Sequence, residues 1–464
     1  MMRFAPFEAR PEVAVGVSGG ADSLCLIHCA DAWARTLGGR AVALIVDHGL
    51  RPESADEAEH VAGWMAAAGI AHQLLSARAA GLDLARGNIQ ASARAGRSAL
   101  MEGWCRRAGV LHLLLAHHRD DPAETLLQRL ARGSGAHGLA AMTPERSLRH
   151  LRVLRPLLDQ PKARLVATLA ARGLGWIEDP SNRDPRFDRV RLREALTAIA
   201  GDDILLTERL AHTAGAMRRT RRLLDAGIDG LLARAVTLSP LGYAMIDARA
   251  LDGADRDLAA RALGLVIATV GAAPHPPRRE AMLRWLRLIA RADGGGATLA
   301  GAQLARWRDR WLVHREPAAV APPITLQPGK SARWDDRFEC ELDSAASGPV
   351  SIGALGRPDP VPGRDTLDLD AVPRPAQSTL PAARLLDGTC RVPHLSAGRN
   401  VSSAVYLALN VFFSPRRPLT DPVSPGERFQ VVARGPNSSR HLRLAAVPVT
   451  GPATGNAKGM TNGA

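Results

Sequence analysis

The stretch VAVGVSGGADSLCLI, residues 13–27, decides the fold of the first half of this chain. Its β-branched run Val13–Val17 predicts a buried strand, and the apolar-periodic segment behind it predicts a helix over 22–37. The two glycines between them let the backbone turn sharply and approach a ligand closely. Unpaired N–H groups at the start of the helix, together with the hydroxyls of Ser18 and Ser23, suit an anion. The stretch therefore predicts a phosphate cradle.

This cradle differs from two common phosphate-binding loops. No Gly-Lys-Ser/Thr closes it, so it is not a Walker A loop, and it lacks the GxGxxG spacing of dinucleotide-binding turns. A Gly-rich turn with Asp22 or Ser23 as the helix cap explains the same residues without any ligand. From these residues alone, both interpretations stay open.

Strand-like and helix-like segments alternate through the rest of the first half. The predicted strands span 41–46, 70–75 and 110–118, and the predicted helices span an Ala/Glu-rich segment through Ala68, 88–108 and 120–132. Apolar strands separated by helices indicate an α/β fold with a parallel sheet covered on both faces. The polar clusters SGGADS, DHG and AHHRDD each follow a strand directly. Because sites in such sheets lie at the carboxyl ends of strands, we expect the three clusters to share one site.

Composition bounds the class of protein. A chain of 464 residues is too long for one ordinary core, so two or three domains are expected. No window approaches the apolar length of a membrane span, and the N-terminus lacks the apolar segment of a secretory signal. The five cysteines are scattered without a CxxC pair, which argues against a disulfide framework or a zinc knuckle. We expect a cytoplasmic protein.

The net charge favours a polyanionic partner without proving one. Lys and Arg number 60 against 46 Asp and Glu, a formal charge of +14. A basic surface attracts nucleic acid through its phosphates, but an Arg-rich composition also arises from genome base composition alone. One basic cluster lies in a predicted helix and suits either RNA contact or a solvated surface: Arg218, Arg219, Arg221 and Arg222.

Three regions follow from the pattern. Residues 1–200 form the predicted catalytic domain, and 201–316 form a mainly helical, Arg-rich domain that ends in strands. Residues 317–464 are Pro-rich and weakly periodic, with one better-patterned stretch at 378–395. The composition of the last residues predicts a disordered tail.

Four longer motifs follow the cradle in order. They are VDHGLRPES (46–54), AHHRDDPAETLLQRLARGSGAHGL (116–139), LRPLL (154–158) and WIEDPSNRDPRFDRVRLR (176–193). SGGADS resembles the SGGxDS motif of the PP-loop ATP pyrophosphatases. The ordered set resembles one family in that superfamily, the tRNA(Ile)-lysidine synthetases. The resemblance is strong over roughly 11–200, weaker through 316, and fragmentary beyond.

The resemblance implies an ATP-dependent carbon–nitrogen ligase. Such enzymes adenylate carbon 2 of the wobble cytidine in the isoleucine tRNA with a CAU anticodon. Free L-lysine then displaces AMP, which leaves lysidine, with pyrophosphate released in the first step. ATP and Mg²⁺ are the implied cofactors, because charge that develops on pyrophosphate must be neutralised. The metal ligands stay undetermined, and a homodimer stays open.

The resemblance also assigns roles to residues. Those expected to hold ATP are Ser18, Gly19, Gly20, Ala21, Asp22, Ser23, Asp47 and His48. Those expected to bind the other substrates are Arg94, Asp120, Asp121, Glu124 and Arg132. The expected catalytic residues are Asp22, Asp47, His117, Asp121 and Glu124. Asp179, Asn182, Arg189, Arg191 and Arg193 are expected to be partly structural and partly RNA-facing. Carboxylates suit the lysine ammonium, and Asp121 and Glu124 share a helix face because they are three residues apart.

Each assignment has a simpler alternative. Asp22 could only cap its helix, and Asp47 with His48 could only form an Asp-His-Gly turn. The acids at 120–124 could only stabilise a helix N-terminus, and Arg132 only a helix C-terminus. The sequence departs from the family at two places: Ser98 stands where a tyrosine is usual, and Pro122 where a glutamine is usual. A proline in the first turn of a helix is tolerated, because its missing N–H would be unpaired there anyway.

Three other functions compete with this one. A PP-loop enzyme that thiolates a tRNA base is the main alternative, but it would need paired catalytic cysteines. Cys25 and Cys29, four apart in a predicted helix, suit packing instead. An ammonia-using amidating enzyme would lack the AHHxDDxxET and EDPSN motifs. A non-catalytic RNA-binding protein would have no reason to keep both the cradle and the acidic cluster.

Overall fold

The computed structural model describes most of the first 415 residues. The described residues are 1–49, 53–80, 89–140, 142–148, 150–178, 190–192, 194, 196, 198, 205–291, 295–356, 369, 372–385, 390–393, 409–415 and 419. At positions 89–92, 136 and 391 only the backbone is described.

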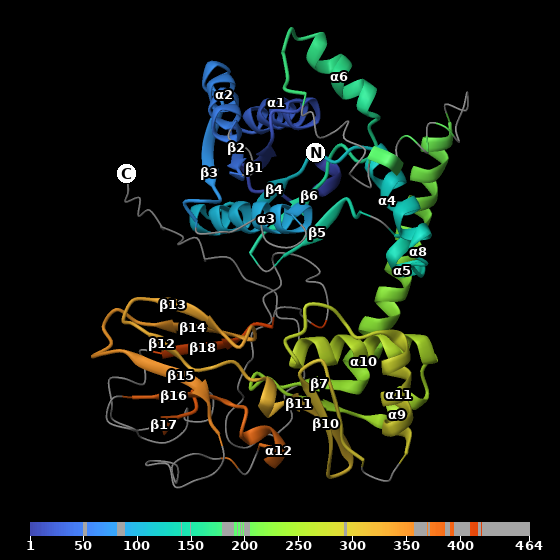
Figure 1. The fold of residues 1–464 in the computed structure, drawn as a ribbon, viewed down its shortest axis with the longest axis vertical. Coiled ribbons are helices and arrows are strands. Elements are labelled where there is room, and N and C mark those ends of the chain that lie inside the picture. Colours follow the sequence, from blue (N-terminus) through green and yellow to red (C-terminus); the bar gives the residue numbers. More distant parts are fainter. Residues whose placement is uncertain are drawn as a thin grey trace, which may run out of the picture. The chain divides into compact units, whose positions relative to one another are not determined.

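A six-stranded sheet, here called sheet A, organises the first half of the chain (Figure 1). Its strands are β1 (Glu12–Val17), β2 (Arg40–Asp47), β3 (Ala71–Ser76), β4 (His112–Leu114), β5 (Glu145–Ser147) and β6 (Arg152–Leu154). They lie in the order β3-β2-β1-β4-β6-β5. All neighbours pair in parallel except β5, which runs antiparallel to β6. The predicted α/β class is confirmed, with an antiparallel edge strand that the sequence did not predict.

The strand order reverses between β1 and β4. From β1 the chain moves outward through β2 to β3, and then returns to place β4 on the other side of β1. Val15 of β1 pairs with Ala43 of β2 on one side and with Leu114 of β4 on the other. In an open parallel sheet such a switch point leaves a crevice at the carboxyl ends of the two strands, where ligands bind. The cradle and the AHHRDD motif follow these two strands.

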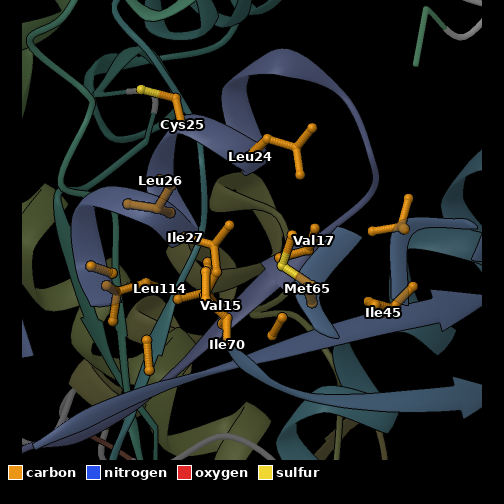
Figure 2. Close-up of a cluster of buried hydrophobic side chains, with 14 of the residues drawn as sticks. Val15, Val17, Leu24, Cys25, Leu26, Ile27, Ile45, Met65, Ile70 and Leu114 are labelled. Atoms are coloured by element: carbon orange, nitrogen blue, oxygen red, sulfur yellow. The ribbon is translucent and has the colours of Figure 1, made fainter. Parts of the chain in front are cut away.

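Helices cover both faces of sheet A. Alternate residues of a strand point to opposite faces, so Val13, Val15 and Val17 belong to one core and Ala14 to another. The first core is closed by α1 (Ala21–Thr36), α2 (Ser54–Ala67) and α6 (Lys162–Ala170), and the second by α3 (Ile89–Ala108). Figure 2 shows the first core, in which Leu24 and Ile27 of α1 meet strand side chains and Met65 of α2.

Besides helical residues between 190 and 198, the described residues of this part of the chain form further helices. They are α4 (Asp120–Ala131), α5 (Ala136–Leu139) and α8 (Leu206–Ala235), and a 3-10 turn spans Met2–Phe4. Strand β4 is shorter than the predicted strand over 110–118, because the chain leaves the sheet after Leu114. The two histidines at 117 and 118 therefore lie in the loop between β4 and α4.

The chain divides into two compact units, and the boundary between Leu223 and Leu224 lies within α8. The three-region division at 200 and 316 stays a prediction. Among the described residues no helix is both long and apolar enough to cross a membrane.

The second unit begins with a layer of helices on an antiparallel sheet. Its strands are β7 (Val236–Leu238), β8 (Ala244–Ile246), β9 (Ala297–Leu299), β10 (Ala302–Trp307) and β11 (Arg310–Arg315), in the order β7-β8-β11-β10-β9. Its helices are α9 (Ala248–Asp252), α10 (Arg256–Val270) and α11 (Arg279–Ala290). Asp247 and Asp255 cap α9 and α10 by accepting hydrogen bonds from backbone N–H groups. The strands predicted within 294–316 are present.

Two small sheets follow, in a region to which the sequence pattern assigns no strands. One contains β12 (Ile324–Leu326), β15 (Val350–Ala354), β16 (Pro381–Arg384) and β17 (Cys390–Arg391). The other contains β13 (Ser331–Trp334), β14 (Phe338–Leu342) and β18 (Leu409–Phe413). A 3-10 turn at Pro317–Ala319 and the short helix α12 (Arg374–Gln377) complete this part. Long-range pairing such as Cys340 with Val411 builds these strands, and a local pattern cannot reveal it.

Candidate functional site

The cradle is a turn closed by Ser23. The Ser23 hydroxyl donates to the carbonyl oxygen of Gly20 at 2.9 Å and accepts from the backbone N–H of Ser18 at 3.1 Å. Gly19 has a φ of +79°, a left-handed conformation that favours glycine. No described side chain caps α1, whose N-cap is Gly20. The N–H groups of its first turn are thus left for an anion, as the cradle interpretation predicts.

Asp22 projects from this turn as a largely buried carboxyl group. Its Oδ1 atom is buried and accepts no hydrogen bond from any described residue. Because α1 has no side-chain cap, the alternative that Asp22 only caps its helix is wrong. Burial raises the pKa of Asp22, the charges of His118 and Lys162 lower it, and those of Asp121 and Asp120 raise it. A partly desolvated carboxylate with one oxygen that accepts no hydrogen bond is suited to a cation.

His118 is the centre of this cluster, whereas the histidine predicted from the sequence was His117. The His118 ring is buried, and its Nε2 atom lies 3.6 Å from Asp22 Oδ2 and 3.8 Å from Asp121 Oδ2. Its Nδ1 atom accepts from the backbone N–H of Asp120 at 3.3 Å. The ring thus joins the start of α1 to the start of α4. The sequence signal is the doubled histidine of AHHRDD, which does not reveal which ring turns inward.

The acids of α4 include one that stabilises the helix start and one that is buried. Asp121 accepts a hydrogen bond from the backbone N–H of His118 at 2.9 Å, so it stabilises the helix N-terminus as the simpler alternative holds. Glu124 is 4% exposed, which is far more buried than a helix-dipole effect requires. Pro122 is the third residue of α4. A residue in the first turn has no hydrogen-bond partner for its backbone N–H within the helix, so a proline, which lacks the N–H, is tolerated there. The acidic cluster therefore contains more carboxylate than capping explains.

Asp47 and His48 lie at the carboxyl end of β2, beside β1. Asp47 Oδ1 accepts from the backbone N–H of Gly49 at 2.8 Å, so the simpler alternative of an Asp-His-Gly turn is observed. The strand-end position nevertheless places both residues on the same edge of sheet A as the cradle. Their role toward ATP stays a prediction.

Two cations of the site were not singled out by the sequence analysis. Lys162 is the first residue of α6, and its charge acts on Asp22. Arg155 directly follows β6, and its Nη1 atom donates to the Thr143 carbonyl oxygen at 2.9 Å. Burial lowers the pKa of Arg155 to about 10, with Arg146 lowering it further and Asp121 opposing both. Both residues belong to the quoted LRPLL motif or follow it closely, which is the signal that could have identified them.

The remaining candidates are not placed in the cluster. Arg94 is exposed on α3, and Arg132 is exposed at the C-terminal cap of α4, where a helix-end role suits it. Ser98 lies on α3, and Arg191 is exposed on a described helical segment. Asp179, Asn182, Arg189 and Arg193 lie outside the described residues. Their predicted roles are neither supported nor contradicted.

The donor set fits magnesium brought by a nucleotide. Within the described part of the chain, no three His, Cys, Asp or Glu side chains are grouped to hold a metal by themselves. Mg²⁺ is commonly held by one or two carboxylates together with substrate phosphates. Asp22, whose buried Oδ1 atom accepts no hydrogen bond from the described residues, provides such a carboxylate.

Comparison with known proteins agrees with this geometry. The family model of the PP-loop domain matches residues 2–199. Fold and site together define a PP-loop ATP-binding protein. The tRNA(Ile)-lysidine synthase of Rhodopseudomonas palustris is 44% identical over 234 residues, which cover 50% of this chain and 67% of the relative.

Two other relatives extend the similarity further along the chain. The tRNA(Ile)-lysidine synthase of a Methylobacterium species is 40% identical over 314 residues, covering 66% of this chain and 89% of the relative. That of Wolbachia pipientis is 33% identical over 355 residues, covering 76% and 81%. This chain belongs to the tRNA(Ile)-lysidine synthase family. Membership confirms the predicted ATP-dependent ligase class, and it favours lysidine synthesis over the thiolation alternative.

Proposed function

We propose that the carboxyl edge of sheet A joins free L-lysine to the wobble cytidine of the isoleucine tRNA with a CAU anticodon. One observation carries the proposal. Asp22 of α1, His118 and Asp121 of α4 converge within 4 Å at the β1–β4 switch point, beside an uncapped helix N-terminus. The cradle would bind the phosphates of a nucleotide, and the neighbouring carboxylates would bind the ammonium group of an amine.

The first step is adenylation. The oxygen on carbon 2 of cytidine attacks the α-phosphorus of ATP, the bond from that phosphorus to the bridging oxygen breaks, and pyrophosphate leaves. Residues 18–23 are assigned to the phosphates, and Asp47 and His48 to the nucleotide pocket. Mg²⁺, held by Asp22 together with phosphate oxygens, would supply charge neutralisation.

The second step is amine transfer. The lysine ε-nitrogen bonds to carbon 2, the bond from carbon 2 to the adenylated oxygen breaks, and AMP departs with that oxygen. Asp120, Asp121 and Glu124 are assigned to the lysine ammonium, because carboxylates form strong charge-assisted hydrogen bonds with a cation. The nitrogen must lose its proton before attack, and the same carboxylates with His117 and His118 are the acceptors at hand.

We assign tRNA binding to arginine side chains of the first unit, most of them on α8. Arg219 and Arg222 are exposed on α8, while Arg218 is half-buried, and burial lowers the pKa of its guanidinium. Arg221, Arg94 and Arg132 complete the proposed set. Guanidinium groups contact RNA phosphates, which position the substrate without reading its sequence. A homodimer and a cytoplasmic location are part of the proposal.

The decisive experiment supplies purified protein with ATP, Mg²⁺, radiolabelled lysine and two transcripts. One is the isoleucine tRNA with a CAU anticodon, and the other is the methionine tRNA with the same anticodon. We expect label only in the isoleucine transcript, together with release of pyrophosphate. Label in both transcripts would contradict the assigned specificity.

Two variants separate the steps. Asp22→Asn should abolish both pyrophosphate release and lysine transfer, because it removes the carboxylate at the cradle. Glu124→Gln should raise the KM for lysine roughly 30-fold, since loss of a buried charge pair costs about 2 kcal/mol. It should leave tRNA-dependent pyrophosphate release near the wild-type rate. Equal loss of both activities in Glu124→Gln would refute its assignment to lysine.

A further inference from the structure

The side chains around the cradle are mostly negative, and such a charge repels the phosphates of ATP. Asp22 is faced by His118 from the loop before α4, by Asp120 and Asp121 from α4, and by Lys162 from α6. Carboxylates therefore outnumber permanently charged cations among the described groups at this point. ATP carries several negative charges, so a site built of carboxylates needs a protein cation as well as Mg²⁺.

Helix α6 packs on α1, and the segments on either side of it are hydrogen-bonded to the start of α4 and to the cradle. Leu165 and Leu169 of α6 are buried in the same core as Leu24 of α1 (Figure 1 shows the two helices side by side). Just before α6, the carbonyl oxygen of Gln160 accepts from the backbone N–H of Arg119 at 2.9 Å. Just after it, the N–H of Ile177 donates to the Gly19 carbonyl oxygen at 2.9 Å. The segment before α6 is thereby held at the start of α4, and the segment after α6 is held at the cradle.

The position of Lys162 has no structural explanation. It is exposed, and it takes part in no hydrogen bond or ion pair with the residues that the structure describes. A cation at a helix N-terminus opposes the helix dipole, so the fold gains nothing from it there. The N-cap of α6 is Pro161, and no described side chain caps this helix. Lys162 thus begins an uncapped helix that packs on α1, and its charge acts on Asp22 at the cradle.

We propose that Lys162 is the phosphate-binding cation of this site, contacting ATP across the cradle from Asp22. This assignment rests on the proposed function, since it names a further residue of the same site. Lys162 stays protonated and forms no covalent bond. Its charge stabilises the electron pair that moves onto the pyrophosphate oxygen when the bond to the α-phosphorus breaks.

The test compares three variants of the full chain. Lys162→Met removes the charge, Lys162→Arg retains it, and Arg164→Met removes an exposed charge two residues further along the same helix. Steady-state kinetics follow pyrophosphate release with the isoleucine transcript at varied ATP and at varied lysine. Circular dichroism melts establish that each variant folds.

We expect Lys162→Met to lower kcat/KM for ATP at least tenfold while the KM for lysine stays unchanged. Lys162→Arg should recover most of the loss, and Arg164→Met should match the wild type. An ATP dependence of Lys162→Met equal to that of the wild type would overturn the proposal. Equal losses in Lys162→Met and Arg164→Met would also overturn it, because a general surface-charge effect would then suffice.

A measurement of ATP binding without tRNA tests the role of Lys162 independently of the proposed reaction. ATP with Mg²⁺ should raise the Tm of the wild type and of Arg164→Met without any tRNA, and should raise that of Lys162→Met much less. If the wild type releases no pyrophosphate with either transcript, the proposed function fails, and the Tm shift alone decides the role of Lys162. Equal shifts in all variants, or no shift in the wild type, would refute it.

Discussion

The ionised carboxyl group of Asp22 destabilises the folded protein at neutral pH. Burial raises its pKa, and the neighbouring carboxylates add to the effect. A folded-state pKa above the unfolded value means that the folded protein binds this proton more tightly. At neutral pH the ionised group therefore lowers the free energy of unfolding, and the cost disappears below the ordinary carboxyl pKa, where both states are protonated.

Replacing Asp22 by asparagine should separate stability from activity. We expect Asp22→Asn to raise the Tm at pH 7 by a few degrees at most, since the uncharged amide tolerates burial. The gain should vanish at pH 3, while activity is lost at every pH. Thermal melts at both pH values test this, and a gain of equal size at pH 3 and pH 7 would show that charge is not the cause.

His118 and His117 illustrate what residue type alone leaves undecided. Both follow β4, and both have the chemistry that the site needs. Only the path of the loop places the His118 ring between Asp22 and Asp121. The position of the histidine in this cluster was thus predictable to within one residue. The choice between neighbours was not.

At the scale of elements, the turn between β1 and α1 depends on one glycine. A Cβ atom at Gly19 would lie 2.8 Å from Val61 Cγ2 of α2 and 3.0 Å from Ile177 Cδ1. The left-handed φ adds backbone strain for any other residue. The conformation of the cradle and its packing against α2 therefore impose the same requirement.

Gly19→Ala should weaken ATP binding and lower stability by about 1–2 kcal/mol, through strain and displacement of Val61. Gly63→Ala is the matched control, because Gly63 is exposed within α2 and its added Cβ would meet nothing within 4 Å. It should be neutral or stabilising by up to about 1 kcal/mol. Urea unfolding gives both values, and a loss in Gly63→Ala as large as in Gly19→Ala would contradict the steric argument.

At the scale of the whole molecule, a buried ionic cluster joins the parts of the second unit. Asp335 Oδ1 lies 2.8 Å from Arg315 Nη2, and Asp335 Oδ2 lies 2.8 Å from Arg337 Nε. Arg337 also donates to the carbonyl oxygen of Gly242 at 3.1 Å, and Arg315 donates to that of Gly271. Burial lowers the pKa of Arg337 to about 10, although Asp335 opposes the shift. The cluster thus connects the β13–β14 hairpin to the helical layer.

Asp335→Asn should destabilise the second unit by about 3 kcal/mol or more, because two buried guanidinium groups lose their counter-charge. Asp336→Asn changes the same charge in the same turn, but the Asp336 side chain is 54% exposed. It should therefore change stability by less than about 1 kcal/mol. Differential scanning calorimetry distinguishes the two, and equal effects would show that the turn rather than the buried cluster matters.

The sequence by itself determined the class of fold and the chemistry of the site. Apolar strands separated by helices specify a parallel sheet, and the Gly-rich turn after Val17 predicts an anion cradle, because both patterns depend on neighbouring residues. The ordered motifs then pointed to the family. Ser18 to Ser23, Asp121 and Glu124 lie where that reasoning placed them, at strand ends and a helix start.

Tertiary structure alone decided which of these groups meet. The order β2-β1-β4 that creates the switch point, the inward turn of His118 and the position of Lys162 beside Asp22 all depend on contacts between residues far apart in the chain. The same holds for the pairing of Cys340 with Val411 that builds a sheet in the weakly patterned C-terminal region. A local sequence pattern shows which backbone conformation a segment prefers and which face of that helix or strand is buried. Long-range pairing reflects the packing of the whole core, which no single stretch encodes.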